Sequence, residues 1–131
     1  MCLCLNEGAT NQWKAKHKNG NQVCVMWKLV TKDTNGDLFS PYTFFPIKTK
    51  GWNEARPEEP QWKQYDEKAP RLLEEGAFHG AVRKKTSSQN RPLDCTIIKC
   101  EFLAKDFVAI GVLGDIAVRR FRLAAKKKHI G

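Results

Sequence analysis

Apolar and polar residues alternate most clearly in the C-terminal third of the chain. In residues 95–102, one face carries Thr96, Ile98, Cys100 and Phe102. The other face carries Lys99 and Glu101. This period of two predicts a half-buried strand with one face towards water.

Two further strands are predicted after it. Residues 107–112 are apolar on both faces, which is typical of a central strand covered from two sides. A turn is expected at Gly114–Asp115. In residues 116–123 the apolar positions change parity halfway, and a β-bulge at Arg119–Arg120 would turn both sets inward and push the arginines towards solvent. We therefore predict a three-stranded antiparallel meander over residues 94–123 that supplies most of the core.

The N-terminal half carries a weaker strand pattern. Residues 23–30 are rich in β-branched side chains, with Lys28 the only clearly polar residue on one face. The other face carries Val23, Val25, Trp27 and Leu29. Asn35–Gly36 favours a hairpin, so residues 37–40 should return along this strand. Residues 6–22 are polar apart from Trp13 and are expected to form a loop or a weak edge strand.

Prolines divide the middle of the chain. Tyr42–Phe45 lies between two prolines, which indicates an edge segment or a lid over the core. Residues 51–70 hold three more prolines and predict a long irregular loop, whose length favours a lid or a binding loop. Arg71–Glu75 is expected to form one helical turn at most. Residues 81–88 are read as a short helix or a basic loop.

These elements predict one α+β domain over residues 1–131, dominated by an antiparallel sheet with one or two short helices. The Trp- and Pro-containing loop 51–70 would lie across the sheet, and the basic tail 124–131 would fray. A chain of 131 residues can bury a sufficient core without disulfides. The five cysteines are therefore expected to be reduced thiols.

The sequence offers no signature of a metal site or of a membrane segment. It has no C-x-x-C pair, and its three histidines are scattered, so we expect no bound metal and no cofactor. No apolar run approaches the ~20 residues of a membrane-spanning helix. Residues 1–5 are too short for a secretory signal. We therefore expect a cytoplasmic protein with no membrane partner.

The net charge of +9 is spread unevenly along the chain. Residues 76–131 hold twelve Lys and Arg against four Asp and Glu. Residues 54–75 are acidic, with four Lys and Arg against seven Asp and Glu. A basic C-terminal half beside an acidic middle implies an anionic partner or internal charge complementarity.

The basic residues are the strongest functional signal, because clustered cations bind phosphates and release counterions. The candidate nucleic-acid or anion-binding set is Arg83, Lys84, Lys85, Arg119, Arg120, Arg122, Lys126, Lys127 and Lys128, with Arg91 close by in sequence. Trp13, Trp52 or Trp62 could stack on unpaired bases. The alternative is a solvated strand face with a solubilising tail. No helix-turn-helix pattern and no RNA-recognition motif is present.

His79 is the one candidate for catalysis. It lies between Gly76 and Gly80, so its ring is expected to be exposed, and carboxylates at Glu74 and Glu75 precede it. The alternative is a loop histidine that caps a turn, which we favour because no orienting partner can be identified. Motifs of the common hydrolases, nucleotide-binding proteins and metalloproteases are missing. An enzyme is therefore the less favoured class.

Three pieces of the sequence follow one another in an order found elsewhere. They are Ser40-Pro41-Tyr42, Gly76-Ala77-Phe78-His79 and the stretch 97–123. In this order of elements the chain resembles a loose group of small uncharacterised bacteriophage and prophage proteins. The resemblance implies a fold type and a viral source, hence the cytoplasm of a host cell, and it implies no reaction.

Three hypotheses for function follow. The leading one is a small non-enzymatic binding protein, whose basic C-terminal face contacts nucleic acid or an acidic protein without reading a base sequence. The second is an enzyme with its site around His79, beneath the loop 51–70. The third is a structural protein in which an exposed edge at Tyr42–Phe45 pairs with another copy.

Overall fold

The computed structural model describes residues 3–40, 45–55, 62–63, 71–73, 76–83 and 95–125, with the backbone alone at 62–63 and 72–73. Within these ranges the fold is mainly antiparallel β-sheet with one α-helix. The elements are β1 (Leu3–Cys4), α1 (Glu7–Lys16), β2 (Val23–Lys32), β3 (Leu38–Phe39), β4 (Pro46–Ile47), β5 (Asn53–Glu54), β6 (Trp62–Lys63), β7 (Leu72–Leu73), β8 (Phe78–Ala81), β9 (Cys95–Leu103), a 3₁₀ turn (Ala104–Asp106), β10 (Phe107–Ile110), β11 (Asp115–Val118) and β12 (Arg120–Leu123).

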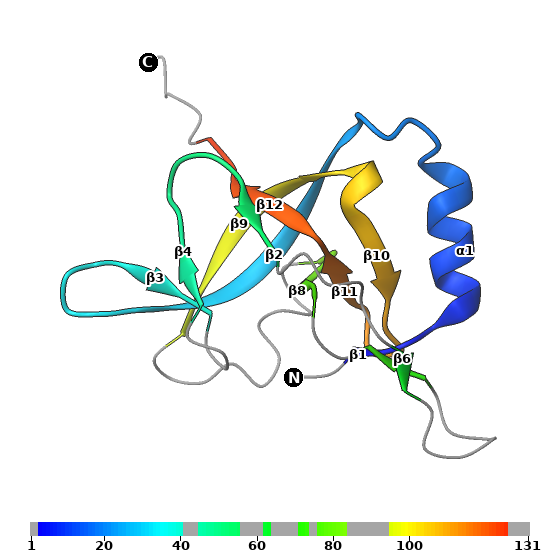
Figure 1. Cartoon of the computed structure of the whole chain (residues 1–131), viewed down its shortest axis with the longest axis horizontal. Helices are drawn as coiled ribbons and strands as arrows, with labels where there is room; N and C mark the ends of the chain where they lie inside the picture. Colours follow the sequence, from blue (N-terminus) through cyan, green and yellow to red (C-terminus); the bar gives the residue numbers. More distant parts are fainter. Residues whose placement is uncertain are drawn as a thin grey trace.

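The main sheet curls back on itself. Its strands are hydrogen-bonded in the order β10-β11-β8-β2-β9-β12-β5, and β3 and β4 extend it beyond β2. Only Arg119 separates β11 from β12, yet β11 pairs with β8 whereas β12 pairs with β9. The path through β8, β2 and β9 therefore begins and ends on one stretch of chain, residues 115–123 (Figure 1).

The main core lies inside this curled sheet. Its fully buried side chains include Met26, Val30, Cys100, Phe102, Ile116, Val118 and Phe121. The apolar positions of residues 116–123 do change parity at the break beside Arg119, as the sequence predicts. Because Ile116 and Val118 precede the break and Phe121 follows it, the break lets both sets point inward.

A smaller sheet, β1-β7-β6, covers a second apolar cluster. Leu3, Ala109 and Ala117 are fully buried there, and Leu5 forms a bridge with Gly111. The prediction of a helical turn at Arg71–Glu75 is wrong at its centre, because β7 is an extended strand that pairs with both β1 and β6. Cross-strand pairing has overridden the weak local preference of the two leucines.

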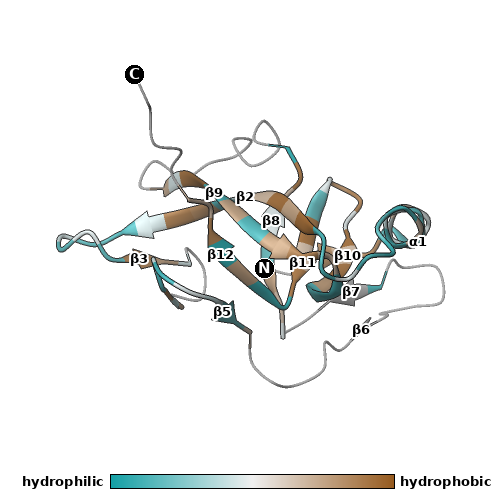
Figure 2. Cartoon of the chain, turned by 90° about the horizontal axis from the view of Figure 1, so that it is seen from above, coloured by the Kyte–Doolittle hydropathy of each residue, from teal (hydrophilic) through white to brown (hydrophobic). Residues whose placement is uncertain are grey.

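Helix α1 corrects the expectation of a loop over residues 6–22. Asn6 caps its start, since the side-chain oxygen accepts a hydrogen bond of 3.1 Å from the N–H of Ala9. Trp13 anchors the helix, because its ring stacks on Phe107 with centroids 3.9 Å apart. Figure 2 shows α1 at one end of the molecule and the hairpin of β2 and β3 at the other.

Strand β2 is present where the sequence predicts it, but the buried face is the one that carries Lys28. Met26 and Val30 are fully buried on this face, and Lys28 is buried between them. Val23 and Val25, on the opposite face, are 47% and 39% exposed. The predicted hairpin is confirmed, because Lys32 pairs with Leu38 around a turn in which Gly36 has a φ of 82°.

The strands of the predicted meander exist, but they are not paired in that order. β9 pairs with β2 and β12, and the 3₁₀ turn carries the chain away before β10 begins. β10 pairs with β11 and lies at the end of the sheet order rather than at its centre. Its two faces are nevertheless covered, because Phe107 joins the main core and Ala109 the second cluster.

Several predicted features fall outside the described residues. They include most of Tyr42–Phe45, most of the loop 51–70, residues 84–88 and the tail beyond Ala125. Of the aromatic segment, Phe45 is described, and its ring packs edge-on against Phe78 with centroids 5.2 Å apart. No helix in the described part of the chain is long and apolar enough to cross a membrane.

Candidate functional site

Two arginines of β12 lie against one tryptophan. The guanidinium carbon of Arg120 is 4.7 Å from the ring centroid of Trp52, and that of Arg122 is 4.8 Å away. Residues 120 and 122 share one face of the strand, and Trp52 directly precedes β5, which pairs with β12. We call Trp52, Arg120 and Arg122 the Trp–Arg cluster. All three residues are candidates from the sequence, but no local pattern in the sequence predicts that they lie together.

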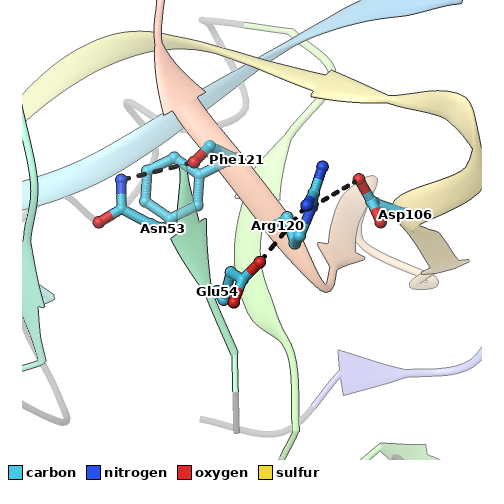
Figure 3. Close-up of polar contacts among 5 residues, drawn as sticks. All are labelled: Asn53, Glu54, Asp106, Arg120 and Phe121. Atoms are coloured by element: carbon cyan, nitrogen blue, oxygen red, sulfur yellow. Dashed lines mark hydrogen bonds and ion pairs between the residues drawn. The ribbon is translucent and has the colours of Figure 1, made fainter. Parts of the chain in front are cut away.

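Carboxylates from three other elements hold these arginines. Arg120 contacts Asp106 through Nε and Glu54 through Nη1, each at 3.3 Å (Figure 3). Arg122 donates from Nε to Glu101 at 2.9 Å. The sequence predicts that the arginines are pushed towards solvent; these two are 29% and 39% exposed, and both are held in ion pairs. Each pair fixes the direction of a guanidinium plane.

Asn53 fixes the backbone that carries Trp52. Its side-chain oxygen accepts a hydrogen bond of 2.7 Å from the N–H of Lys48, and its amide donates to the carbonyl of Lys48 at 3.2 Å. The same amide donates to the carbonyl of Phe121 at 3.4 Å (Figure 3). Because Asn53 is almost fully buried, it holds the turn after β4 against β12.

Three exposed lysines lie on segments next to β5 and β12. Lys48 and Lys50 lie in the turn that Asn53 closes, and Lys99 lies on β9, whose carbonyl there accepts from the N–H of Ala124 at 3.1 Å. With the two arginines, this region carries five positive charges. The carboxylates of Glu54, Glu101 and Asp106 supply three negative charges. Among the described residues of this region, the positive charges therefore outnumber the negative charges despite the ion pairs.

The other predicted cations are distributed differently. Arg119 lies at the break between β11 and β12, where its backbone N–H donates to the backbone carbonyl of Asp106 and its carbonyl accepts from the N–H of Ala55. Arg83 is exposed beyond β8, whose last residue pairs with the start of β11. Arg83 therefore follows the β8–β11 pair, whereas Arg122 lies on β12, which pairs with β9 beyond the break at Arg119. Lys84, Lys85, Arg91, Lys126, Lys127 and Lys128 lie outside the described residues.

One of the predicted stacking residues, Trp13, does not join the site. Trp13 lies in the core contact with Phe107, and its other ring neighbour is His17, with centroids 3.9 Å apart. Its faces are therefore used for packing. The side chain of Trp62 lies outside the described part of the structure.

A second cluster of titratable groups is buried inside the sheet. The amine of Lys28 donates to the backbone carbonyl of His79 at 2.9 Å. Burial lowers the pKa of Lys28 to about 8. Burial, and then the positive charge of Lys28, lower the pKa of His79 to about 4. Burial raises the pKa of the Cys100 thiol to about 12, although Lys28 opposes this change.

The position of His79 differs from the expected exposed loop. His79 lies in β8, and its Nε2 atom is buried without a hydrogen-bond partner among the described residues. Glu74 and Glu75, the carboxylates of the predicted acid–base site, lie outside the described ranges. Lys28 is one of the buried polar residues that the sequence pattern did not predict. Its signal was a single lysine on an otherwise apolar strand face.

Among the described residues, no group of three or more His, Cys, Asp or Glu side chains is arranged to hold a metal ion. Comparison of the chain with protein-family models, with curated proteins and with solved structures finds no match. The resemblance to bacteriophage proteins therefore stays a prediction. What the fold and the site define is a mainly-β protein with a cationic, tryptophan-containing surface on β12 and β5.

Proposed function

We propose that this chain is a small non-enzymatic nucleic-acid-binding protein, and that the Trp–Arg cluster with its neighbouring lysines is the contact surface. One observation carries the proposal: two guanidinium groups lie within 5 Å of the centroid of one half-buried indole ring. Guanidinium groups bind phosphate oxygens, and the shared contact with the indole ring holds both groups at one place on the surface. Nucleic acid presents such phosphates in a row.

The ion pairs of the cluster are compatible with this role. Arg122 contacts Glu101 through Nε, and a guanidinium carries four further N–H donors on its terminal nitrogens. A phosphate can therefore bind Arg122 while the pair with Glu101 stays in place. The contacts would be to the backbone of the nucleic acid, so binding is expected to be largely independent of base sequence.

Fluorescence anisotropy of labelled oligonucleotides at low and at moderate salt tests the proposal. Binding should weaken with salt, and Arg120→Gln/Arg122→Gln should lower both the affinity and the salt slope, by about one for each lost phosphate contact. Lys14→Gln/Lys16→Gln is the matched control, because both lysines are exposed on α1, which packs against β10 rather than β12. This control removes the same charge and should bind almost as the parent protein does.

A second variant keeps the test valid if loss of the Arg120 ion pairs unfolds the protein. Lys48→Gln/Lys50→Gln changes two exposed side chains and leaves the ion pairs intact. It should also weaken binding. Absence of binding at low salt, or an equal loss in the α1 control, would overturn the proposal. Displacement of the oligonucleotide by polyglutamate would count against the proposed function, because it would point to an acidic protein partner.

A further inference from the structure

The two arginines of the Trp–Arg cluster differ in how many of their nitrogens are engaged. A guanidinium group binds an oxyanion through two parallel N–H bonds, which come either from Nε and one terminal nitrogen or from the two terminal nitrogens. In Arg120, Nε contacts Asp106 and Nη1 contacts Glu54 (Figure 3). Each of these two edges of Arg120 therefore contains a nitrogen that is already in an ion pair.

Arg122 keeps one such edge. Its Nε donates to Glu101 at 2.9 Å, which leaves the edge formed by the two terminal nitrogens for an oxyanion. Contact with Trp52, whose ring centroid is 4.8 Å from the guanidinium carbon, restricts where the group can lie. Arg122 is also the more exposed of the two arginines. It is therefore the better suited of the two to a bidentate phosphate contact.

Lys99 on β9 is a neighbour of Arg122 on the same face of the sheet. Arg122 pairs with Glu101, and Lys99 lies two residues from Glu101 along β9, so Arg122 and Lys99 are diagonal neighbours. Cβ atoms in such a diagonal pair are roughly 7 Å apart, which is within reach of long side chains. Lys99 is exposed, and no ion pair with a described carboxylate holds its amine. The two cations can therefore contact one phosphate or two successive phosphates.

Arg120 ties several segments together instead. Its ion pairs reach Asp106 in the 3₁₀ turn and Glu54 on β5. Its guanidinium carbon also lies 4.7 Å from the ring centroid of Trp52. Arg120 therefore fixes β12 against two neighbouring segments and restrains the indole ring against which Arg122 lies.

We infer that Arg122 and Lys99 bind the phosphates of the nucleic acid, and that Arg120 is a positioning residue that holds Trp52 and, through it, the guanidinium group of Arg122. The inference rests on the proposed function, because it assigns roles within the same site. The ligand group is a phosphodiester, held by one two-nitrogen edge and one amine. The effect of Arg120 on binding is indirect.

Anisotropy of one labelled oligonucleotide with single variants, over a range of salt concentrations, tests the phosphate contacts. Lys99→Gln and Arg122→Gln should each weaken binding and lower the salt slope by about one. Arg122→Lys keeps the charge but loses the two-nitrogen edge, and it should weaken binding about five-fold. Lys16→Gln, an exposed position on α1, is the control and should leave the slope unchanged.

Arg120 should behave differently in the same series. Arg120→Gln should weaken binding, because Arg122 loses its fixed position, but the salt slope should stay that of the parent protein. Arg120→Lys, whose amine can still pair with Asp106 or Glu54, should retain most of the affinity. A slope lowered by about one in Arg120→Gln, or a loss in Arg120→Lys as large as that in Arg122→Lys, would show a direct phosphate contact and overturn the positioning role.

The outcomes separate this inference from the proposed function. Binding that persists with an unchanged salt slope in Lys99→Gln or in Arg122→Gln would overturn the phosphate assignment and leave nucleic-acid binding intact. Failure of the parent protein to bind at low salt would overturn both. Circular dichroism and the thermal midpoint of each variant should show that the fold is retained. If Arg120→Gln does not fold, the comparison of Arg120→Lys with Arg122→Lys decides the role of Arg120.

Discussion

The amine of Lys28 on β2 donates a hydrogen bond of 2.9 Å to the backbone oxygen of His79 on β8. The same amine lies 5.9 Å from the ring centroids of Phe78 and Phe121. Among the described residues, no carboxylate lies within ion-pair distance of it. The protein therefore buries a cation whose neighbours are one carbonyl and two aromatic rings, and this arrangement costs stability at neutral pH.

Replacement of this cation should stabilise the fold. Lowering the pKa of Lys28 from 10.5 to about 8 corresponds to roughly 3 kcal/mol. Lys28→Met keeps the shape of the side chain, removes the charge and loses one hydrogen bond worth about 1 kcal/mol. We expect the free energy of unfolding in urea at pH 7 to rise by about 1 to 3 kcal/mol.

The exposed end of the same strand provides the control for this substitution. Lys32→Met changes the same residue type where the side chain faces solvent, and it should alter stability little. A Lys28→Met protein that is less stable than its parent would show that the ammonium group is a net contributor to the fold.

Lys28 should also make the protein more stable at mildly alkaline pH. The unfolded chain keeps this proton up to about pH 10.5, whereas the folded protein loses it near pH 8. Between these values the unfolded chain binds more protons, so the free energy of unfolding rises with pH. We expect a gain of about 1 kcal/mol from pH 8 to pH 9, measured by urea denaturation.

Above pH 9 the thiol of Cys100 should oppose this gain. Its folded pKa of about 12 exceeds the ordinary 9.0, so stability is lost as the unfolded chain ionises. The Lys28→Met protein should lack the rise between pH 8 and pH 9, and Cys100→Ala should extend the rise beyond pH 9. A flat profile in the parent protein would contradict the buried amine.

His79 should make the protein sensitive to acid. Its pKa falls from 6.5 to about 4 on folding, so the unfolded chain binds more protons within this range. The free energy of unfolding should therefore decrease as the pH falls from 6.5 to 4, by roughly 2 to 3 kcal/mol. Denaturation curves at pH 7, 5.5 and 4.5 would show it.

A His79→Gln protein should lose this part of the acid dependence. His17→Gln, on α1, is the control that changes a histidine and retains His79, and it should keep the dependence. An unchanged acid profile in His79→Gln would mean that other groups cause it.

Asn53 is expected to be the most sensitive position near the candidate site. Asn53→Ala removes one acceptor and one donor group that together serve Lys48 and Phe121, and it leaves their backbone groups without these partners. We expect a loss of about 2 to 3 kcal/mol in the free energy of unfolding. The exposed Asn11 on α1, changed to Ala, should cost little. An equally small effect at both positions would show that Asn53 does not hold the turn after β4 against β12.

Regular alternation made most of the long strands predictable. Residues 95–103 and 23–32 are strands because β-branched and apolar side chains recur every second position. The break at Arg119 was predictable too, since apolar residues change parity there and a sheet buries only one parity without a break. These features depend on near neighbours in the sequence.

Features that depend on distant residues were missed. Helix α1 has one large apolar residue, so its stability comes from a cap at Asn6 and from the contact of Trp13 with Phe107. The burial of Lys28 on β2 could not be predicted from the strand alone, because Phe78 and Phe121, which lie beside its amine, come from distant strands. The order of the sheet joins strands far apart in the chain, and no local pattern records such pairing.

The candidate site also has one part that the sequence predicts and one part that it does not. A surplus of basic residues in the sequence pointed to Arg120 and Arg122, and the structure describes both on the face of β12. Their carboxylate partners come from β5, β9 and the 3₁₀ turn, so their effect on the charge of the surface could not be anticipated.

The curled sheet has a consequence for synthesis of the protein on the ribosome. Strand β2 is made early, but its long partner β9 and the stretch 115–123 that joins the two ends of the path are made last. Until then the apolar face around Met26 and Val30 has no lasting cover. A nascent chain halted before Cys95 should therefore recruit chaperones or aggregate, and release of the C-terminal third should end that exposure.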